Sequence, residues 1–138
     1  MDNHTSEQRH RNMVNIKSVS SLEDKVRKYL FSKGFRYRKN DRRYPGHPDI
    51  ILQKYHTVIF INGCFWHQHP GCSRATVPKT NLEYWETKLR RNKERDEENC
   101  RILKEKGWNV VVLWECELTN KRFEETLLLL ENNLRSLA

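Results

Sequence analysis

The sequence predicts a mixed α/β fold in which a small mixed sheet is flanked by helices. The prediction rests on the order of its segments: an amphipathic helix, two or three short apolar runs, a long charged helix, a further apolar run and a final helix. Elements in this order pack as layers, with helices covering the sheet. A length of 138 residues suits a single core. We therefore expect one domain over residues 20–138, preceded by a basic arm over residues 1–19.

The first helix is expected to begin at Ser20. Ser20 and Glu23 have the spacing of a capping box, in which each side chain binds the other residue's backbone N–H group. Gly34 can end this helix, because glycine readily adopts the left-handed conformation that follows a helix. The apolar side chains that share one helical face are Leu22, Val26, Tyr29 and Leu30.

The centre of the chain is expected to form a hairpin followed by a long loop. Residues 35–38 (FRYR) predict a short strand, and a turn-rich stretch follows them. Residues 49–52 and 57–61 are two apolar runs separated by a turn, which predicts a pair of hairpin strands. The segment from residue 62 to about residue 80 is expected to be a loop.

The second half of the chain alternates helix, strand and helix. Residues 81–106 are periodic and highly charged, and Gly107 follows them, so a long helix is expected there. Residues 109–114 (NVVVLW) predict a buried strand. Residues 121–136 predict an amphipathic C-terminal helix with four consecutive leucines at its centre.

The chain carries a formal net charge of +8, from 26 basic and 18 acidic residues. A small basic domain usually binds nucleic acid, although a basic surface can also serve solubility alone. No stretch resembles a membrane span or the apolar core of a signal peptide, so we expect a cytoplasmic protein. Cysteines stay reduced in that compartment, which favours metal ligation over disulfides.

Two cysteines and a histidine on the central loop have the spacing of metal ligands. Cys64, His69 and Cys72 form the pattern C-x4-H-x2-C, and Cys116 follows the last expected strand. Three thiolates and one imidazole can form a closed tetrahedral zinc site. Free buried cysteines and surface histidines are the alternative. His67 could compete with His69 for the metal, and it is free for other chemistry if His69 is the ligand.

Acidic residues could gather at the end of the hairpin. Asp49 opens the first hairpin strand, Glu23 lies on the first helix and Asp96 on the charged helix, while His67 follows the second strand. Mg²⁺ prefers carboxylate ligands and supports phosphodiester hydrolysis when it bridges a phosphate. A histidine can accept the proton of the attacking water. In the alternative, Glu23 only caps its helix and Asp96 only pairs with a neighbouring basic side chain.

Phe65 and Trp66 are adjacent large aromatic residues on the polar loop. Adjacent large aromatic side chains on a polar loop can insert into a binding partner. Core packing of one of the two is the alternative. Trp85 has the same alternative, because it lies in phase with Leu82 and Leu89 on the charged helix.

Segments around these residues resemble the very short patch repair endonucleases of bacteria, mismatch-nicking relatives of the PD-(D/E)xK nucleases. The resemblance runs from about Ser6 to Leu118 and implies a restriction-endonuclease-like core. It implies nicking of one DNA strand 5′ to the thymine of a T:G mismatch, which arises when 5-methylcytosine deaminates. It also implies catalytic Mg²⁺ and structural zinc. The segments that carry it are PGHPDIIL, VIFINGCFWHQHPGC, EYWETKLRRNKERD and GWNVVVLWECEL.

Matched position by position, the resemblance implies a catalytic centre. Asp49 would be the principal Mg²⁺ ligand, and the backbone carbonyl of Ile61 would make a second contact to the metal. His67 would act on the attacking water. Asp96 would support the catalytic centre, and Glu23 would lie near it on its helix.

The resemblance also implies zinc ligands, DNA contacts and partners. Phe65, Trp66 and Trp85 would insert into the base stack from the major-groove side, and the arm around Met13 would approach from the minor groove. The substrate would be double-stranded DNA with a T:G mismatch, with a functional link to a cytosine-5 DNA methyltransferase. We expect a monomer, associated with the bacterial nucleoid. The implied zinc ligands are Cys64, His69, Cys72 and Cys116.

Two departures from related patterns stand out. The general PD-(D/E)xK pattern has an acid and a lysine near Phe60 and Asn62, and this sequence has neither. The resembled family also lacks that lysine, so this departure agrees with the resemblance. Some members have histidine where Asn62 stands. Asparagine can hydrogen-bond a phosphate or a water but carries no charge, so Asn62 is a candidate site residue without an acid–base role. The HPGC spacing is also one residue longer than in some members, so the match of Cys72 to a zinc ligand is weaker than that of Cys64.

Two other functions compete with the mismatch nuclease. A zinc-stabilised DNA-binding module would keep the charge and the Cys/His cluster but would have no use for Asp49 and His67 together. A nuclease of the same fold could instead act on another lesion or on unmodified sites.

Overall fold

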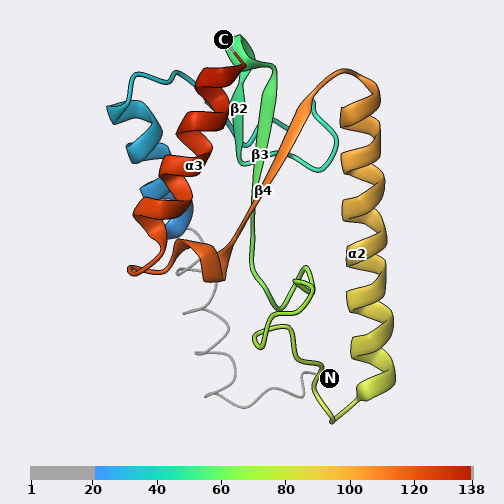
Figure 1. Cartoon of the computed structure of the whole chain (residues 1–138). Coiled ribbons are helices and arrows are strands. Elements are labelled where there is room, and N and C mark those ends of the chain that lie inside the picture. The colour runs from blue at the N-terminus through green and yellow to red at the C-terminus, as the bar shows by residue number, and fades with distance from the viewer. Residues whose placement is uncertain (1–20, 138) are drawn as a thin grey trace.

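The computed structural model describes residues 21–137, which form a four-stranded sheet between layers of helices (Figure 1). The strand order in the sheet follows the order in the chain. The first three strands pair antiparallel, and the last pairs parallel to the third. This confirms the expected small mixed sheet. The strands are β1 (Arg38–Lys39), β2 (Ile50–Leu52), β3 (Thr57–Asn62) and β4 (Asn109–Trp114).

The helices cover both faces of this sheet. The first helix spans residues 21–32, and it lies with α3 (Phe123–Ser136) on one face (Figure 1). The long helix α2 (Leu82–Glu105) lies on the other face. Two short 3-10 helices, η1 (Gln53–Tyr55) and η2 (Glu115–Leu118), follow β2 and β4. No described helix has the length and apolar character that a membrane crossing requires.

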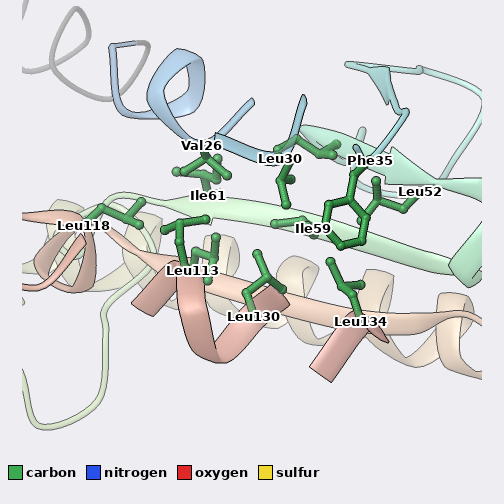
Figure 2. Packing of buried hydrophobic residues seen from close by; sticks show 12 residues of the cluster. Val26, Leu30, Phe35, Leu52, Ile59, Ile61, Leu113, Leu118, Leu130 and Leu134 are labelled. Carbon is green, nitrogen blue, oxygen red and sulfur yellow. The ribbon is translucent and has the colours of Figure 1, made fainter. Parts of the chain in front are cut away.

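The larger core lies between the sheet, the first helix and α3 (Figure 2). Successive side chains of a strand point to opposite faces, so Ile50 and Leu52 enter this core while Ile51 enters the smaller one beneath α2. Both faces of β2 are therefore buried, which explains its unbroken apolar sequence. The larger core contains Val26, Leu30, Phe35, Ile59, Ile61, Leu113, Leu118, Leu127, Leu130 and Leu134.

Glycines end two of the helices as expected. Gly34 and Gly107 have φ angles of +90° and +89°. The N–H group of Phe35 donates to the carbonyl of Leu30, and that of Trp108 donates to Leu103, both at 3.0 Å. This is the Schellman geometry, which turns the chain sharply from a helix toward the sheet. The expected capping box at Ser20 lies outside the described residues, as does the arm with Met13.

The short strand expected at residues 35–38 is wrong for most of its length. Only Arg38 enters β1, which is two residues long. The N–H group of Phe35 closes the end of the first helix, and its ring packs against Tyr55 with centroids 5.2 Å apart. Phe35 therefore packs in the core, and the chain joins the sheet only at Arg38.

The expected burial of residues 109–114 is also wrong in part, whereas the expected amphipathic C-terminal helix is confirmed. The strand β4 lies at the edge of the sheet, and Leu113 is its one fully buried residue. Of the four consecutive leucines in α3, Leu127 and Leu130 are buried, while Leu128 and Leu129 are 53% and 61% exposed. A helix turns about 100° per residue, so four neighbours cannot all face one core.

Candidate functional site

Asp49 is held at the start of β2 by two contacts with β3. Its Oδ2 accepts a hydrogen bond from the backbone N–H of Ile61 at 2.6 Å. Its own N–H donates to the carbonyl of Ile59 at 3.0 Å. Because the hairpin register fixes both contacts, the Asp49 carboxyl has one defined position beside the end of β3.

The carboxyl of Glu23 reaches Asp49 from the first helix. Burial, and next the charge of Asp49 and a hydrogen bond with it, raise the pKa of Glu23 to about 7. Burial likewise raises the pKa of Asp49. Two carboxyl groups in contact repel when both are ionised, and a cation between them relieves that repulsion. Glu23 thus forms an acidic pair with Asp49.

His67 and Asp96 form a second pair beside the first. The Nδ1 atom of His67 lies 2.5 Å from Oδ2 of Asp96, and both side chains are about 30% exposed. Burial dominates the raised pKa of Asp49, and the charge of His67 opposes it only in part; that influence places the two pairs near each other. Arg95 is a neighbouring basic residue, and its Nη2 atom donates a hydrogen bond to Oδ1 of Asn92 at 2.9 Å. Asp96 therefore pairs with His67 and not with Arg95.

The Cys/His cluster assembles from the loop and η2. Cys64, His69, Cys72 and Cys116 each offer a ligand atom, and these four atoms lie within 4.8 Å of one another. The Nδ1 atom of His69 lies 3.7 Å from the sulfur of Cys64 and 3.4 Å from that of Cys116. The four residues could therefore hold one metal ion, and His67 stands outside the cluster.

The surroundings of the cluster set its geometry and its charge. The ring of His69 stacks on Trp114 of β4, with centroids 4.1 Å apart and planes 8° apart. Burial raises the pKa of Cys64 to about 12, whereas the backbone N–H of Arg74 lowers the pKa of Cys72. A metal ion that binds here has to displace the Cys64 proton, because thiolates are the ligands.

Four aromatic rings form a partly exposed cluster between the loop and the start of α2. Phe65 lies 5.0 Å from Trp66 and 5.7 Å from Trp85, and Trp66 lies 5.9 Å from Trp85. Tyr84, which the sequence did not single out, lies 5.4 Å from Trp85. Trp66 is 38% exposed and Tyr84 is 58% exposed. Trp85 joins this cluster and neither core, so its in-phase position with Leu89 does not make it a core residue.

Polar groups surround the exposed rings. The Lys88 Nζ lies 5.8 Å from the Trp66 ring and 5.9 Å from the Tyr84 ring. The Asn92 side chain donates to the carbonyl of Trp66 at 3.4 Å. The exposed rings therefore carry the Lys88 ammonium group at their surface.

Asn62 ends β3, where it is half-buried and in register with Trp114. No hydrogen bond links its side chain to the other described site residues.

Other residues near the site carried no clear sequence pattern. Trp114 stacks on His69, and Glu115 accepts a hydrogen bond from the N–H of Cys64 at 3.4 Å. Arg27 is buried one helical turn after Glu23. The spacing of Arg27 from Glu23 was the one available signal, because residues four apart on a helix are neighbours.

The first 74 residues match the model of a family described as DNA mismatch endonuclease Vsr. They include Glu23, Asp49, His67 and the first three members of the Cys/His cluster. The chain belongs to the Vsr family. It is therefore a DNA endonuclease, and a DNA-binding module without catalysis is excluded.

Relatives extend the match to the second half of the chain. The DNA mismatch endonuclease Vsr of Escherichia coli K12 is 37% identical over 121 residues, which is 87% of this chain and 77% of the relative. The type II nicking enzyme V.XorIIP of Xanthomonas oryzae is 38% identical over 120 residues, or 86% of this chain and 88% of the relative. The type II nicking enzyme V.NmeAIP of Neisseria meningitidis is 55% identical over 96 residues, or 70% and 68%. The proteins to which this chain is similar thus include both a mismatch endonuclease and nicking enzymes.

Proposed function

We propose that the protein is a Mg²⁺-dependent endonuclease that nicks one strand 5′ to the thymine of a T:G mismatch. It would act in very short patch repair of deaminated 5-methylcytosine, on a restriction-endonuclease-like PD-(D/E)xK core within residues 20–138. The observation that carries the proposal is the position of the Glu23–Asp49 pair beside the His67–Asp96 pair. Family membership supplies the DNA substrate.

The acidic pair supports a magnesium site. Asp49 would be the principal ligand, Glu23 would lie beside it, and the backbone carbonyl of Ile61 would complete the protein's contribution. Two carboxyl groups in contact form an oxygen-rich donor set, which fits the preference of Mg²⁺. Bound Mg²⁺ would neutralise charge on the phosphate and favour deprotonation of water.

The histidine pair supports a general base. The Nδ1 atom of His67 is engaged by Asp96, which leaves Nε2 as the nitrogen that can accept a proton from the attacking water. Asp96 would orient the ring and stabilise its charged form. Asn62, an uncharged residue at the end of β3, would contact the phosphate or its water.

The Cys/His cluster supports structural zinc. A tetrahedral zinc with bonds of about 2.0 Å to nitrogen and 2.3 Å to sulfur places these atoms about 3.5 Å apart. The two nitrogen-to-sulfur distances of 3.7 and 3.4 Å fit that value. Four closed protein ligands suit a structural site, and zinc would hold the loop that carries Phe65, Trp66 and His67.

The aromatic cluster and the basic charge support DNA binding. Phe65, Trp66 and Trp85 would insert beside the mismatch, where unstacking costs less than in paired DNA. The net charge of +8 favours phosphate contacts, and the arm around Met13 would reach the minor groove. We infer a monomer in the bacterial cytoplasm, working on the nucleoid alongside a cytosine-5 DNA methyltransferase.

A nicking assay tests the proposal. Wild-type protein should nick a T:G duplex in Mg²⁺, leave the matched T:A duplex intact and do nothing without a divalent cation. Asp49→Ala should lower the nicking rate by at least about 10³-fold, because the loss of a principal metal ligand removes charge stabilisation worth several kcal/mol. Binding to the T:G duplex should remain within a few-fold of wild type. A wild-type rate for Asp49→Ala would show that the metal centre is placed wrongly.

The second candidate is a nuclease of the same fold that acts on another lesion or on unmodified sites. It is kept because several relatives are described only as type II nicking enzymes. The same assay separates the two candidates. Equal rates on matched and T:G duplexes would favour the second candidate over mismatch specificity.

A further inference from the structure

Arg27 is a buried arginine on the first helix that the proposed reaction does not use. The residue is 8% exposed, and its side chain is 10% exposed. Its Nη2 atom donates to Oδ1 of Asp24 at 2.7 Å. Its Nη1 atom has no hydrogen-bond partner, and among the described residues it is the one buried side-chain nitrogen or oxygen in that state.

An unpaired buried donor is costly. Leaving such a group without a partner costs about 1–3 kcal/mol, and more when the group is charged. Most buried polar side-chain atoms in folded proteins are paired, so an exception beside a reaction centre suggests a partner that completes the bond in the working state. Arg27 lies one helical turn from Glu23, which in turn contacts Asp49.

Glu23 offers an acceptor close to the unpaired donor. Its Oε2 atom lies 3.7 Å from Nη1 of Arg27, too far for a hydrogen bond. A charge-assisted bond between a guanidinium and a carboxylate has a length of about 2.7–2.9 Å. A shift of about 1 Å in the Glu23 side chain would therefore close the bond. In the present arrangement the Glu23 carboxyl is engaged with Asp49.

We propose that Arg27 is a positioning residue of the nuclease centre, whose Nη1 clamps Glu23 when Glu23 and Asp49 hold a divalent cation. The inference rests on the proposed function, because it assigns the acidic pair to that cation. The clamp has two points: Nη2 is anchored on Asp24, and Nη1 is directed at Glu23. The planar guanidinium holds these two donors in a fixed fork, which a lysine ammonium cannot reproduce.

Arg27→Lys is the discriminating variant. It keeps the positive charge, so the repulsion between residue 27 and the cation is retained while the fork is lost. We expect the affinity of the DNA-free, zinc-loaded protein for Mg²⁺, measured by calorimetry, to fall about tenfold. One charge-assisted hydrogen bond has about that effect on an equilibrium constant. The Mg²⁺ concentration that gives half-maximal nicking should rise about tenfold, with the rate at saturating Mg²⁺ within about threefold of wild type.

Arg101→Lys is the matched control. Arg101 also forks between two carboxylates, those of Glu98 and Glu105, but on the exposed surface of α2. It should leave the affinity for Mg²⁺ unchanged. Asp24→Asn is a second test that keeps Arg27 and removes the charge of its anchor. Because Asp24 is 63% exposed, the variant should fold, and its affinity for Mg²⁺ should fall about threefold.

Three results separate the possibilities. Wild-type affinity for Mg²⁺ in both Arg27→Lys and Asp24→Asn would overturn the inference and leave Arg27 with a role in helix stability alone. Equal losses in Arg27→Lys and Arg101→Lys would also overturn it, because they would indicate a general effect of arginine replacement. If wild-type protein bound no Mg²⁺, or if Asp49→Ala did not weaken Mg²⁺ binding, the proposed centre and the clamp would fail together.

Discussion

At the scale of single residues, Gly46 lies in the loop before Asp49, where the backbone packs closely against two other elements. Its φ angle is +78°, a conformation that side chains with a Cβ rarely adopt. A Cβ at this position would lie 3.1 Å from the Asn99 side chain on α2 and 3.1 Å from the Phe60 ring on β3. Gly46 thus lets the loop before Asp49 pass close to both elements.

We expect Gly46→Ala to lower the free energy of unfolding by roughly 2–3 kcal/mol, through backbone strain and the two close contacts. Denaturant titration measures this. Gly34→Ala is the control, because Gly34 also has a positive φ of +90° but no atom within 4 Å of an added Cβ. It should cost about 1 kcal/mol. Equal losses in the two variants would show that the contacts of Gly46 contribute nothing.

At the scale of elements, Glu131 joins α3 to the first helix. Its carboxylate accepts a hydrogen bond from the Tyr29 hydroxyl at 3.0 Å and one from Nη2 of Arg135 at 2.8 Å. Arg135 also donates to the carbonyl of Lys33 near the end of the first helix at 3.2 Å. The bonds from Arg135 and then from Tyr29 lower the pKa of Glu131. The two helices that cover one face of the sheet are therefore linked by polar contacts as well as by the core.

The direction of this shift predicts a pH dependence. A lowered carboxyl pKa stabilises the fold above the ordinary value of 4.5, and this contribution is lost as pH falls through the lowered pKa. Glu131→Gln should therefore melt a few degrees below wild type at pH 6–7, and the difference should vanish in acid.

Glu98→Gln is the control for this prediction. The pKa of Glu98 is also lowered by an arginine, Arg101, but the pair lies exposed within α2 and joins no second element. Exposed pairs contribute little to stability, so this variant should melt close to wild type at every pH. A pH-independent deficit in Glu131→Gln would indicate lost packing in place of lost charge.

At the scale of the whole molecule, the Cys/His cluster connects the loop to the end of the sheet where β3 and β4 terminate. Cys64 and Cys116 follow the adjacent parallel strands β3 and β4, and His69 stacks between the loop and β4. The same loop carries Phe65 and His67, which belong to the aromatic cluster and to the His67–Asp96 pair. Loss of a bound metal would therefore disturb the aromatic cluster and the His67–Asp96 pair together.

We expect purified protein to contain about one zinc per chain, measured by elemental analysis. Cys72→Ser should reduce the zinc content well below one and lower the melting temperature, because metal binding contributes folding free energy. Cys100→Ser is the control, since Cys100 lies on α2 outside the cluster. It should keep its zinc. Full zinc content in Cys72→Ser would remove Cys72 from the ligand set.

The hairpin strands, the helix ends and the loop members of the Cys/His cluster were predictable because their patterns are local. Gly34 and Gly107 end helices through contacts within six residues, and the spacing of Cys64 and His69 lies within one loop. The roles of Glu23 and Asp96 stayed open, because each has a common local role as a cap or a surface ion pair. Tyr84 was missed because an exposed tyrosine on a charged helix carries no pattern of its own.

The sequence by itself determined the order of elements, the Cys/His cluster and the resemblance to its family. Only the tertiary structure decided that Glu23 meets Asp49, that Asp96 engages His67 and that Arg27 is buried with an unpaired donor. It also placed β4 at the sheet edge, half-exposed despite its apolar sequence. Periodicity reports which face of an element is apolar, whereas the partner of a polar side chain depends on how distant elements pack.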